Sequence, residues 1–345
     1  MADFDPGGVA KKGNLFGFPY DMVDADLVVI PMPWDVTASY GDGASYGPKA
    51  ILYASDQLDF SIPGLIAPWT FKTVLAPEDS DLRDLNEKTR PIAKRVISAW
   101  EQGIRPSQVD IDKVNAACEQ MIQTGIRLAE ELISRQVKVA FVGGDHSTPL
   151  GLLTVLAREH QFGILQIDAH MDLRAGYEGF KYSHASIMYN ALLLSNITTL
   201  TQVGIRDFAE EEVEYASRSS KDVNVFYDEA ISRRLFQGTS WSHIVTEIVA
   251  SLPSKVYVSV DIDGLEPSNC PNTGTPVPGG LTYSQVIYLL QELANSGKQI
   301  IGFDLSEVCP GQDDWDGNVG ARVLYRLATC MGISCGAIKG SEGNL

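Results

Sequence analysis

Short apolar runs alternate with longer amphipathic segments along most of this chain. The short runs are rich in Val, Ile and Phe and predict buried strands, whereas the longer segments repeat their apolar positions with a helical period. The predicted strands are 27–30, 137–142, 163–167, 199–203, 223–226, 256–260 and 299–303. The predicted helices are 48–55, 92–100, 110–135, 148–159, 184–194, 208–217, 241–251, 282–296 and 318–331. This alternation predicts βαβ units, and therefore an α/β fold whose mostly parallel sheet is covered by helices on both faces.

Three regions depart from this regular pattern. The four glycines in residues 1–24 predict an N-terminal arm. We expect residues 25–340 to form one large domain, because 345 residues suit a single layered α/β core. The glycine-rich stretch 34–47 predicts a surface loop. Residues 72–108 are polar and charged, and they predict an insertion beside the core.

Charge and cysteine content narrow the classes of function. A formal net charge of −17 opposes binding to nucleic acid and to anionic membrane surfaces. No stretch approaches the ~20 apolar residues that span a bilayer, and no apolar targeting segment opens the chain. The five cysteines show neither CxxC spacing nor a paired framework, which favours a reducing compartment. We therefore expect a cytoplasmic protein with no nucleic-acid and no membrane partner.

Acidic residues and histidines follow three of the predicted strands directly. The sequences GGDHS (143–147), DAHMD (168–172) and Asp261-Ile262-Asp263 each begin where a strand ends. The carboxyl ends of parallel strands share one edge of a sheet, and ligand sites of this architecture lie there. A spacing of two residues in extended chain places side chains on the same side. We therefore expect these carboxylates and imidazoles to converge.

So many carboxylates in one place would repel one another and raise one another's pKa unless cations neutralised them. Oxygen-rich ligation with imidazole and without thiolate suits Mn²⁺ or another borderline first-row ion. Four aspartates with two histidines exceed what one ion takes, whereas two ions about 3.5–4 Å apart with bridging carboxylates would use them all. Singly, each motif also fits a helix cap, an ion pair or a hydrogen-bonded core histidine. Their coincidence at three strand ends favours a site for two metal ions.

The three motifs resemble those of the ureohydrolase family, which includes arginase and agmatinase. They occur in the family's order, the third extending as SVDIDGLEPSNCPNTGTPVPGGL over 259–281, and the resemblance covers about residues 27–330. It implies the three-layer α/β/α arginase-like fold and a binuclear manganese centre, with nickel as an alternative. It also implies a homo-oligomer, either a trimer or a hexamer.

The resemblance implies a set of ligands for each of the two cations, with Asp168 and Asp261 as bridges. The first set is His146, Asp168, Asp172 and Asp261. The second set is Asp168, His170, Asp261 and Asp263.

Three residues acquire catalytic roles from the same resemblance. Asp172 would orient the attacking water and receive its proton, and His184 would pass a proton to the leaving amine. Glu307 would meet the cationic guanidinium of the substrate. Residues 172–186 are similar to agmatinases rather than to arginases, so the resemblance favours the agmatinase-like branch.

The implied reaction is hydrolysis of a guanidino C–N bond in a small compound, releasing urea and an amine or ammonia. Trp315 and the stretch 34–47 would line the pocket around the substrate tail, and these features resemble a branch that hydrolyses free guanidine with nickel. An equal alternative is that Trp315 anchors a surface loop to the helix that begins near Asn318. A guanidinobutyrase is a further candidate. Arg174 leaves open a formiminoglutamase, which would release formamide. A non-catalytic paralogous subunit is the last alternative, and the complete set of ligands opposes it.

Overall fold

A single parallel sheet of eight strands forms the centre of the molecule. The computed structural model describes residues 5–341. The strands are β1 (Leu27–Met32), β3 (Thr73–Leu75), β4 (Lys138–Gly143), β5 (Phe162–Ile167), β6 (Ile197–Ile205), β7 (Asp222–Tyr227), β8 (Lys255–Asp261) and β9 (Gln299–Ser306). Their order is β3-β1-β4-β9-β8-β5-β6-β7, and every neighbouring pair is parallel. The predicted, mostly parallel sheet is confirmed.

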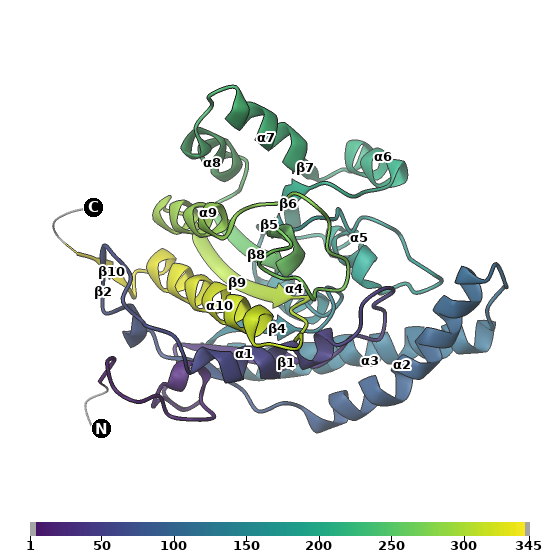
Figure 1. Ribbon diagram of the computed structural model, residues 1–345, viewed down its shortest axis with the longest axis horizontal. Coiled ribbons are helices and arrows are strands. Elements are labelled where there is room, and N and C mark those ends of the chain that lie inside the picture. The colour runs from purple at the N-terminus through teal and green to yellow at the C-terminus, as the bar shows by residue number, and fades with distance from the viewer. Residues whose placement is uncertain (1–4, 342–345) are drawn as a thin grey trace.

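Helices cover both faces of this sheet, so the fold has three α/β/α layers (Figure 1). One layer holds α1 (Gly47–Ser55), α7 (Asp228–Phe236), α8 (Trp241–Ala250), α9 (Tyr283–Asn295) and α10 (Trp315–Ser334). The other holds α2 (Ser80–Glu101), α3 (Gln108–Ile133), α4 (Leu150–Glu159), α5 (Ile187–Leu192) and α6 (Glu210–Arg218). Strand residues alternate between the two cores: in β1, Val28 packs with the second layer and Val29 with the first. Continuous apolar strands such as β1 are expected in a sheet that is buried on both faces.

The segment 72–108, expected beside the core, contributes to it. Residues 73–75 form the edge strand β3, and α2 buries Leu82, Val96 and Ile97. The predicted helix 92–100 is only the second half of α2, because the helix continues through Pro91. Figure 1 shows α2 and α3 side by side as a long hairpin that extends beyond the sheet. Burial of one face of α2 thus outweighs the backbone hydrogen bond that proline removes.

Part of the N-terminal segment, expected as a loose arm, is packed on the core. A short 3₁₀ turn η1 (Leu15–Gly17) buries Phe16, and Phe18 is buried after it. The ring of Phe16 lies edge-on to Tyr325 of α10, with centroids 5.2 Å apart. These aromatic contacts hold residues 15–18 of the arm against the core.

Two small features complete the fold. Strands β2 (Leu65–Ile66) and β10 (Lys339–Gly340) form a separate antiparallel pair. Further 3₁₀ turns are η2 (Ala44–Tyr46), η3 (Pro68–Thr70), η4 (His184–Ser186) and η5 (Ile262–Gly264). Within residues 5–341, no helix has the length and apolar composition to cross a membrane.

Candidate metal centre

Four neighbouring strands in the middle of the sheet deliver the polar residues singled out from the sequence. In the order β4-β9-β8-β5, each strand is hydrogen-bonded to the next, and all four run in the same direction. The residues that follow β4, the end of β8 and the residues that follow β5 carry the three motifs, and Glu307 follows β9. The sheet topology therefore gathers the motifs at one edge, as strand-end positions require.

The first group of converging side chains surrounds Nδ1 of His146. This atom lies 3.0 Å from Oδ2 of Asp168, 3.0 Å from Oδ2 of Asp172 and 3.4 Å from Oδ2 of Asp261. All four side chains are buried. Asp261 faces this group with Oδ2, and its Oδ1 accepts the backbone N–H of Asp263 at 2.9 Å.

The second group surrounds Nδ1 of His170. This atom lies 3.2 Å from Oδ2 of Asp263 and 3.6 Å from Oδ1 of Asp168. The His170 side chain is 24% exposed and marks the open side of the centre. Asp168 thus offers one carboxylate oxygen to each group. Its orientation is fixed because Oδ1 accepts the N–H of His170 at 2.7 Å and Oδ2 accepts the side-chain amide of Gln166 at 2.7 Å.

These two groups fit divalent cations. The candidate ligand atoms of His146, Asp168 and Asp172, and those of Asp168, His170 and Asp263, lie within 4.8 Å of one another in each group. Nδ1 of His146 is buried and has no hydrogen-bond partner among the described residues, although carboxylate oxygens surround it. On the opposite side of the ring, Nε2 lies 2.9 Å from Oγ of Ser259. An imidazole held from behind, with its free nitrogen facing carboxylates, is the usual arrangement of a metal ligand.

Without cations, the centre has to balance its own charges by protonation. Burial and the neighbouring Asp168 raise the pKa of Asp172 to about 7. Burial, Asp263 and Asp168 raise the pKa of Asp261 well above its usual value. Burial alone would lower the pKa of His170, but Asp263 and Asp168 raise it to about 12. The carboxylates therefore compete for protons that bound cations would displace.

Two residues of the centre have a left-handed backbone conformation that is uncommon outside glycine. Asp172 has a φ of 55° and Glu307 a φ of 62°. Such conformations cost about 1–3 kcal/mol and persist where the surrounding contacts demand them. At Asp172 the backbone oxygen accepts the N–H groups of Met188 and Tyr189 at 3.1 Å each. The strain therefore falls on two residues whose side chains face the centre.

Glu307 is buried beside the candidate metal ligands. One of its carboxylate oxygens accepts the backbone N–H of His146 at 2.9 Å, and its own N–H donates to the carbonyl of Gly144 at 2.7 Å. Burial and the neighbouring Asp145 raise its pKa well above the usual range. A Cβ on Gly274 would stand 3.5 Å from its second carboxylate oxygen, so the chain passes close over that oxygen. A buried acid of this kind accommodates a cation that would bring it back to the ionised state.

His184 lies at the start of η4, on the open side of the centre. The backbone N–H of His184 donates to Oγ1 of Thr37 at 3.1 Å. Its ring atom Nε2 lies 3.5 Å from Oγ of Ser39. The ring of Tyr177 stands edge-on to it at 6.1 Å. Burial and the neighbouring His170 lower the pKa of His184 to about 4, so the imidazole is neutral at neutral pH.

A cavity of about 170 Å³ opens over His170, Asp172 and His184. Its other lining residues are Ser39, Arg174, Tyr177, Ala185, Asp207, Phe208, Glu212 and Thr275. Sequence reasoning missed three of them, Asp207, Phe208 and Glu212; the others belong to the stretches 34–47, 172–186 and 259–281 that the sequence had singled out. Asp207 and Phe208 come just after β6, so the strand-end rule that found the other motifs would have found this pair had the strand been predicted to its true end at residue 205.

Trp315, expected to line this cavity, does not do so. It is the first residue of α10, its indole N–H donates to the carbonyl of Ser268 at 2.9 Å, and its surface is 48% exposed. It therefore anchors the loop before α10 to the loop that follows η5. The stretch 34–47, also expected at the cavity, does reach it through Ser39. The first residues of this stretch are not a surface loop, because Trp34 is fully buried.

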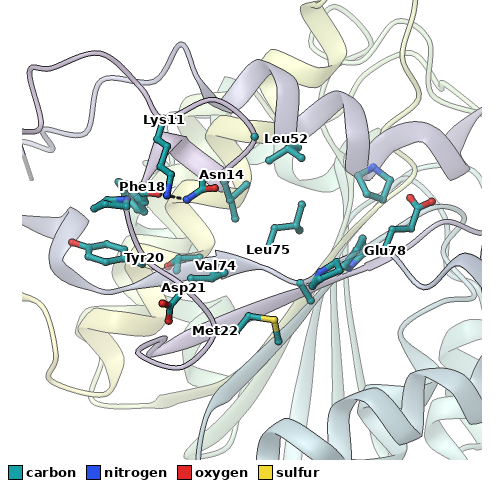
Figure 2. Close-up of a pocket in the computed structure, with 18 of the residues that line it drawn as sticks. Lys11, Asn14, Phe18, Tyr20, Asp21, Met22, Leu52, Val74, Leu75 and Glu78 are labelled. Atoms are coloured by element: carbon teal, nitrogen blue, oxygen red, sulfur yellow. Dashed lines mark hydrogen bonds between the residues drawn. The ribbon is translucent and has the colours of Figure 1, made fainter. Parts of the chain in front are cut away.

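A second, larger cavity of about 680 Å³ lies away from the centre (Figure 2). It lies between the N-terminal segment, β3 and α1, and Figure 2 shows Leu52 and Leu75 facing it with Tyr20 and Met22 nearby. None of the candidate metal ligands is among its lining residues. It is therefore not the site of the chemistry that the strand-end motifs predict.

Comparison with known proteins gives a consistent picture. A model of the Arginase family matches residues 25–331. The chain is 32% identical to the N(1)-aminopropylagmatine ureohydrolase of Thermus thermophilus, an alignment that covers 92% of this chain and 94% of that protein. It is 31% identical to the agmatinase of Sodalis glossinidius over 95% of each chain. Its fold is similar to the crystal structure of agmatine ureohydrolase from Thermoplasma volcanium, with a TM-score of 0.68, 24% identity and 96% of each chain covered.

Proposed function

Since this chain belongs to the arginase family and is a ureohydrolase of the agmatinase-like branch, we propose that it hydrolyses a small guanidino compound at a centre of two divalent cations. The products would be urea and an amine. The observation that carries the proposal is the shared ligand Asp168, whose two oxygens face two separate groups of metal-ligating atoms. A carboxylate that offers one oxygen to each of two ligand groups can hold a pair of neighbouring cations.

The donor atoms support manganese. Carboxylate oxygens with one imidazole nitrogen in each group, and no thiolate, suit Mn²⁺, and Ni²⁺ is the second candidate. The first cation would be held by His146, Asp168, Asp172 and Asp261. The second would be held by Asp168, His170, Asp261 and Asp263.

When bound, such a pair supplies Lewis acidity and a nucleophilic water at neutral pH. The protein residues hold the substrate and move its protons. Asp172, whose carboxylate faces the same group of ligand atoms as His146, would receive the proton of the attacking water. His184 is neutral at neutral pH, and once protonated it is a strong acid towards a leaving amine. Glu307, held beside His146 by its backbone N–H, would offset the positive charge of the guanidinium.

The charges around the cavity support a substrate tail that is cationic. Arg174 could attract a carboxylate tail, but its guanidinium lies 3.7 Å from Glu212 and 3.8 Å from Glu211, and it stacks over Tyr177 at 4.9 Å. Its charge is thereby offset. Asp207 lines the same cavity with no hydrogen bond or ion pair to its side chain among the described residues. An agmatine-like amine therefore fits better than guanidinobutyrate or formiminoglutamate.

Free guanidine is the second candidate, and the cavity size favours it. About 170 Å³ suffices for a substrate without a tail, whereas typical sites for larger ligands measure about 300–1,000 Å³. A non-catalytic paralogue is the least supported alternative, because every candidate ligand and both His184 and Glu307 are present.

A urea-release assay with the Mn²⁺- or Ni²⁺-loaded protein tests the proposal. The substrates are agmatine, guanidinobutyrate, arginine and free guanidine, with formiminoglutamate followed by formamide release. We expect the highest kcat/KM for agmatine with Mn²⁺. A preference for free guanidine with Ni²⁺ would select the second candidate. Absence of urea from all four guanidino compounds would overturn the proposed function.

Two wider expectations accompany this function. We infer a homo-oligomer, a trimer or a hexamer, from the family resemblance, and analytical ultracentrifugation would measure it. We also infer a cytoplasmic location, because the five cysteines are all free and four of them are buried. Free buried thiols fit a reducing compartment.

A further inference from the structure

One face of α2 is hydrogen-bonded to loop 35–45, the loop that carries Thr37 and Ser39. Arg83, Asn86, Arg90 and Lys94 are spaced three or four residues apart and so share that face. Each of the four side chains bonds to loop 35–45. Nothing in the proposed chemistry requires this face.

Arg90 makes the densest of these contacts. Its Nη1 donates to the carbonyls of Val36 at 2.9 Å and Ala38 at 2.6 Å, and its Nε donates to Asp42 at 3.1 Å. Lys94 also pairs with Asp42. The Arg90 side chain is only 12% exposed, unlike most charged side chains on a helix surface. Two carbonyls on either side of residue 37 are therefore fixed by one partly buried guanidinium.

Asn86 fixes the first residue of the loop. Its side chain and Asp35 exchange two hydrogen bonds, Asp35 N–H to Asn86 Oδ1 at 2.8 Å and Asn86 Nδ2 to Asp35 Oδ1 at 3.1 Å. The second oxygen of Asp35 accepts the N–H groups of Gly43 at 3.1 Å and Ser45 at 3.3 Å. The carbonyl of Ser45 accepts Arg83 at 3.1 Å. The two ends of the loop are thus tied together and to the helix.

The inner side of the loop bonds to the active site through Thr37. Its hydroxyl donates to Oδ2 of Asp145 at 2.9 Å and accepts the N–H of His184 at 3.1 Å, and its N–H donates to the same Oδ2 at 3.2 Å. Thr37 and Asp145 are fully buried. Asp145 precedes the ligand His146, and a Cβ on Gly144 would stand 1.7 Å from the carbonyl oxygen of Trp34. Thr37 therefore connects the turn that carries one metal ligand to the turn that carries His184.

We propose that the polar face of α2 is a positioning element for the active site, which holds loop 35–45 so that Thr37 sets the place of His184. The proposal rests on the proposed function, since it assigns the element to the proton transfer performed by His184. It gives a role to the helix of segment 72–108. Thr37 and Arg90 are positioning residues here, because they act through His184 and do not touch the reacting atoms.

The first test changes Thr37. Thr37→Val keeps the branched shape but loses the hydroxyl that joins Asp145 to His184. We expect kcat for urea release to fall about 10²-fold with KM changed less than about 2-fold, the effect of a misplaced catalytic group. Thr37→Ser keeps the hydroxyl and should recover most of that loss. An unchanged kcat in Thr37→Val would overturn the proposal.

The second test acts from outside the buried network. Arg90→Gln removes the bonds to loop 35–45, and we expect kcat to fall about 10-fold at unchanged metal content. The matched control is Arg95→Gln, which removes an arginine of the same helix whose partner is Asp110 and whose side chain is 59% exposed. Equal losses in the two variants would show a general effect on α2 and would overturn the proposal.

A third measurement needs no turnover. In protein labelled with ε1-¹³C-histidine and loaded with diamagnetic Zn²⁺, the chain gives five histidine signals, and His184→Asn identifies the signal of His184. Thr37→Val and Arg90→Gln should shift that signal, whereas Thr37→Ser and Arg95→Gln should leave it in place. A signal that does not move in Thr37→Val overturns the positioning role. Failure of the wild-type protein to release urea would instead overturn the proposed function alone.

Discussion

Asp263→Asn should remove one of two bound cations and leave the other. Asp263 belongs to the group around His170 and not to the group around His146. Its Oδ2 lies 3.2 Å from Nδ1 of His170, while its Oδ1 accepts the N–H of Ala169 at 3.1 Å. An asparagine can keep the second contact with its carbonyl oxygen. The substitution therefore removes a charge from one cation site with the fold intact.

The size of the effect follows from the charge that is lost. Two unit charges about 4 Å apart interact by about 4 kcal/mol at an effective dielectric constant of about 20. Since about 1.4 kcal/mol corresponds to a tenfold change, affinity for the second cation should fall on the order of 10³-fold. Affinity for the first cation should change far less, because Asp263 is outside its group of ligand atoms.

Equilibrium dialysis with elemental analysis measures both sites. The wild-type protein should hold two ions per chain, and Asp263→Asn about one at the same free Mn²⁺ concentration. Asp207→Asn is the matched control, because it removes a carboxylate beside the same cavity that belongs to neither group. Two ions with unchanged affinity in Asp263→Asn would refute the assignment of this residue, and equal loss in Asp207→Asn would indicate a general electrostatic effect.

Three other predictions concern the substrate, the pH and the cavity. Glu307→Gln should lower kcat/KM for a guanidinium substrate about 10²-fold or more without loss of metal, and steady-state kinetics with metal analysis would check both. Metal affinity should rise as the pH increases through about 7. In the metal-free protein, burial and Asp168 raise the pKa of Asp172 to about 7, and the protonated carboxyl cannot ligate. Calorimetry between pH 6 and 8 that finds no change in metal affinity would contradict this. Trp315→Ala should cost about 1–2 kcal/mol of stability and reduce turnover of every substrate by the same small factor, since the indole anchors a loop to Ser268. A changed order of substrates in that variant would return Trp315 to the cavity wall.

Much of the fold and of the candidate metal centre could be predicted from the sequence, because both depend on local patterns. Buried parallel strands are continuous apolar runs in the sequence. The residues that follow their carboxyl ends lie at the same edge of the sheet, whatever the length of the loops. Asp168 and His146 are therefore predictable neighbours although 21 residues separate them, and their side chains meet at 3.0 Å. Asp261 approaches the first group only through one oxygen, a detail of side-chain direction that spacing does not contain.

The other features of the fold and of the candidate site depend on contacts between segments that are distant in the sequence, and no local pattern predicts such contacts. Helix α7 was missed because β7 passes directly into it at Asp228, without a loop between them. The hydroxyl of Thr37 bonds to residues 108 and 147 positions away, and Arg90 reaches loop 35–45 across about 50 residues. Trp315 is near Glu307 in sequence, yet its indole turns to Ser268. Sequence proximity left a place in the cavity wall and a loop anchor equally open, and the contact with Ser268 favours the anchor.

Anomalous diffraction from crystals of the Mn²⁺-loaded protein would test the binuclear centre most directly. We predict two peaks per chain, one beside His146 and Asp172 and the other beside His170 and Asp263, with the carboxylate of Asp168 between them. A single peak, or peaks away from these side chains, would contradict the account.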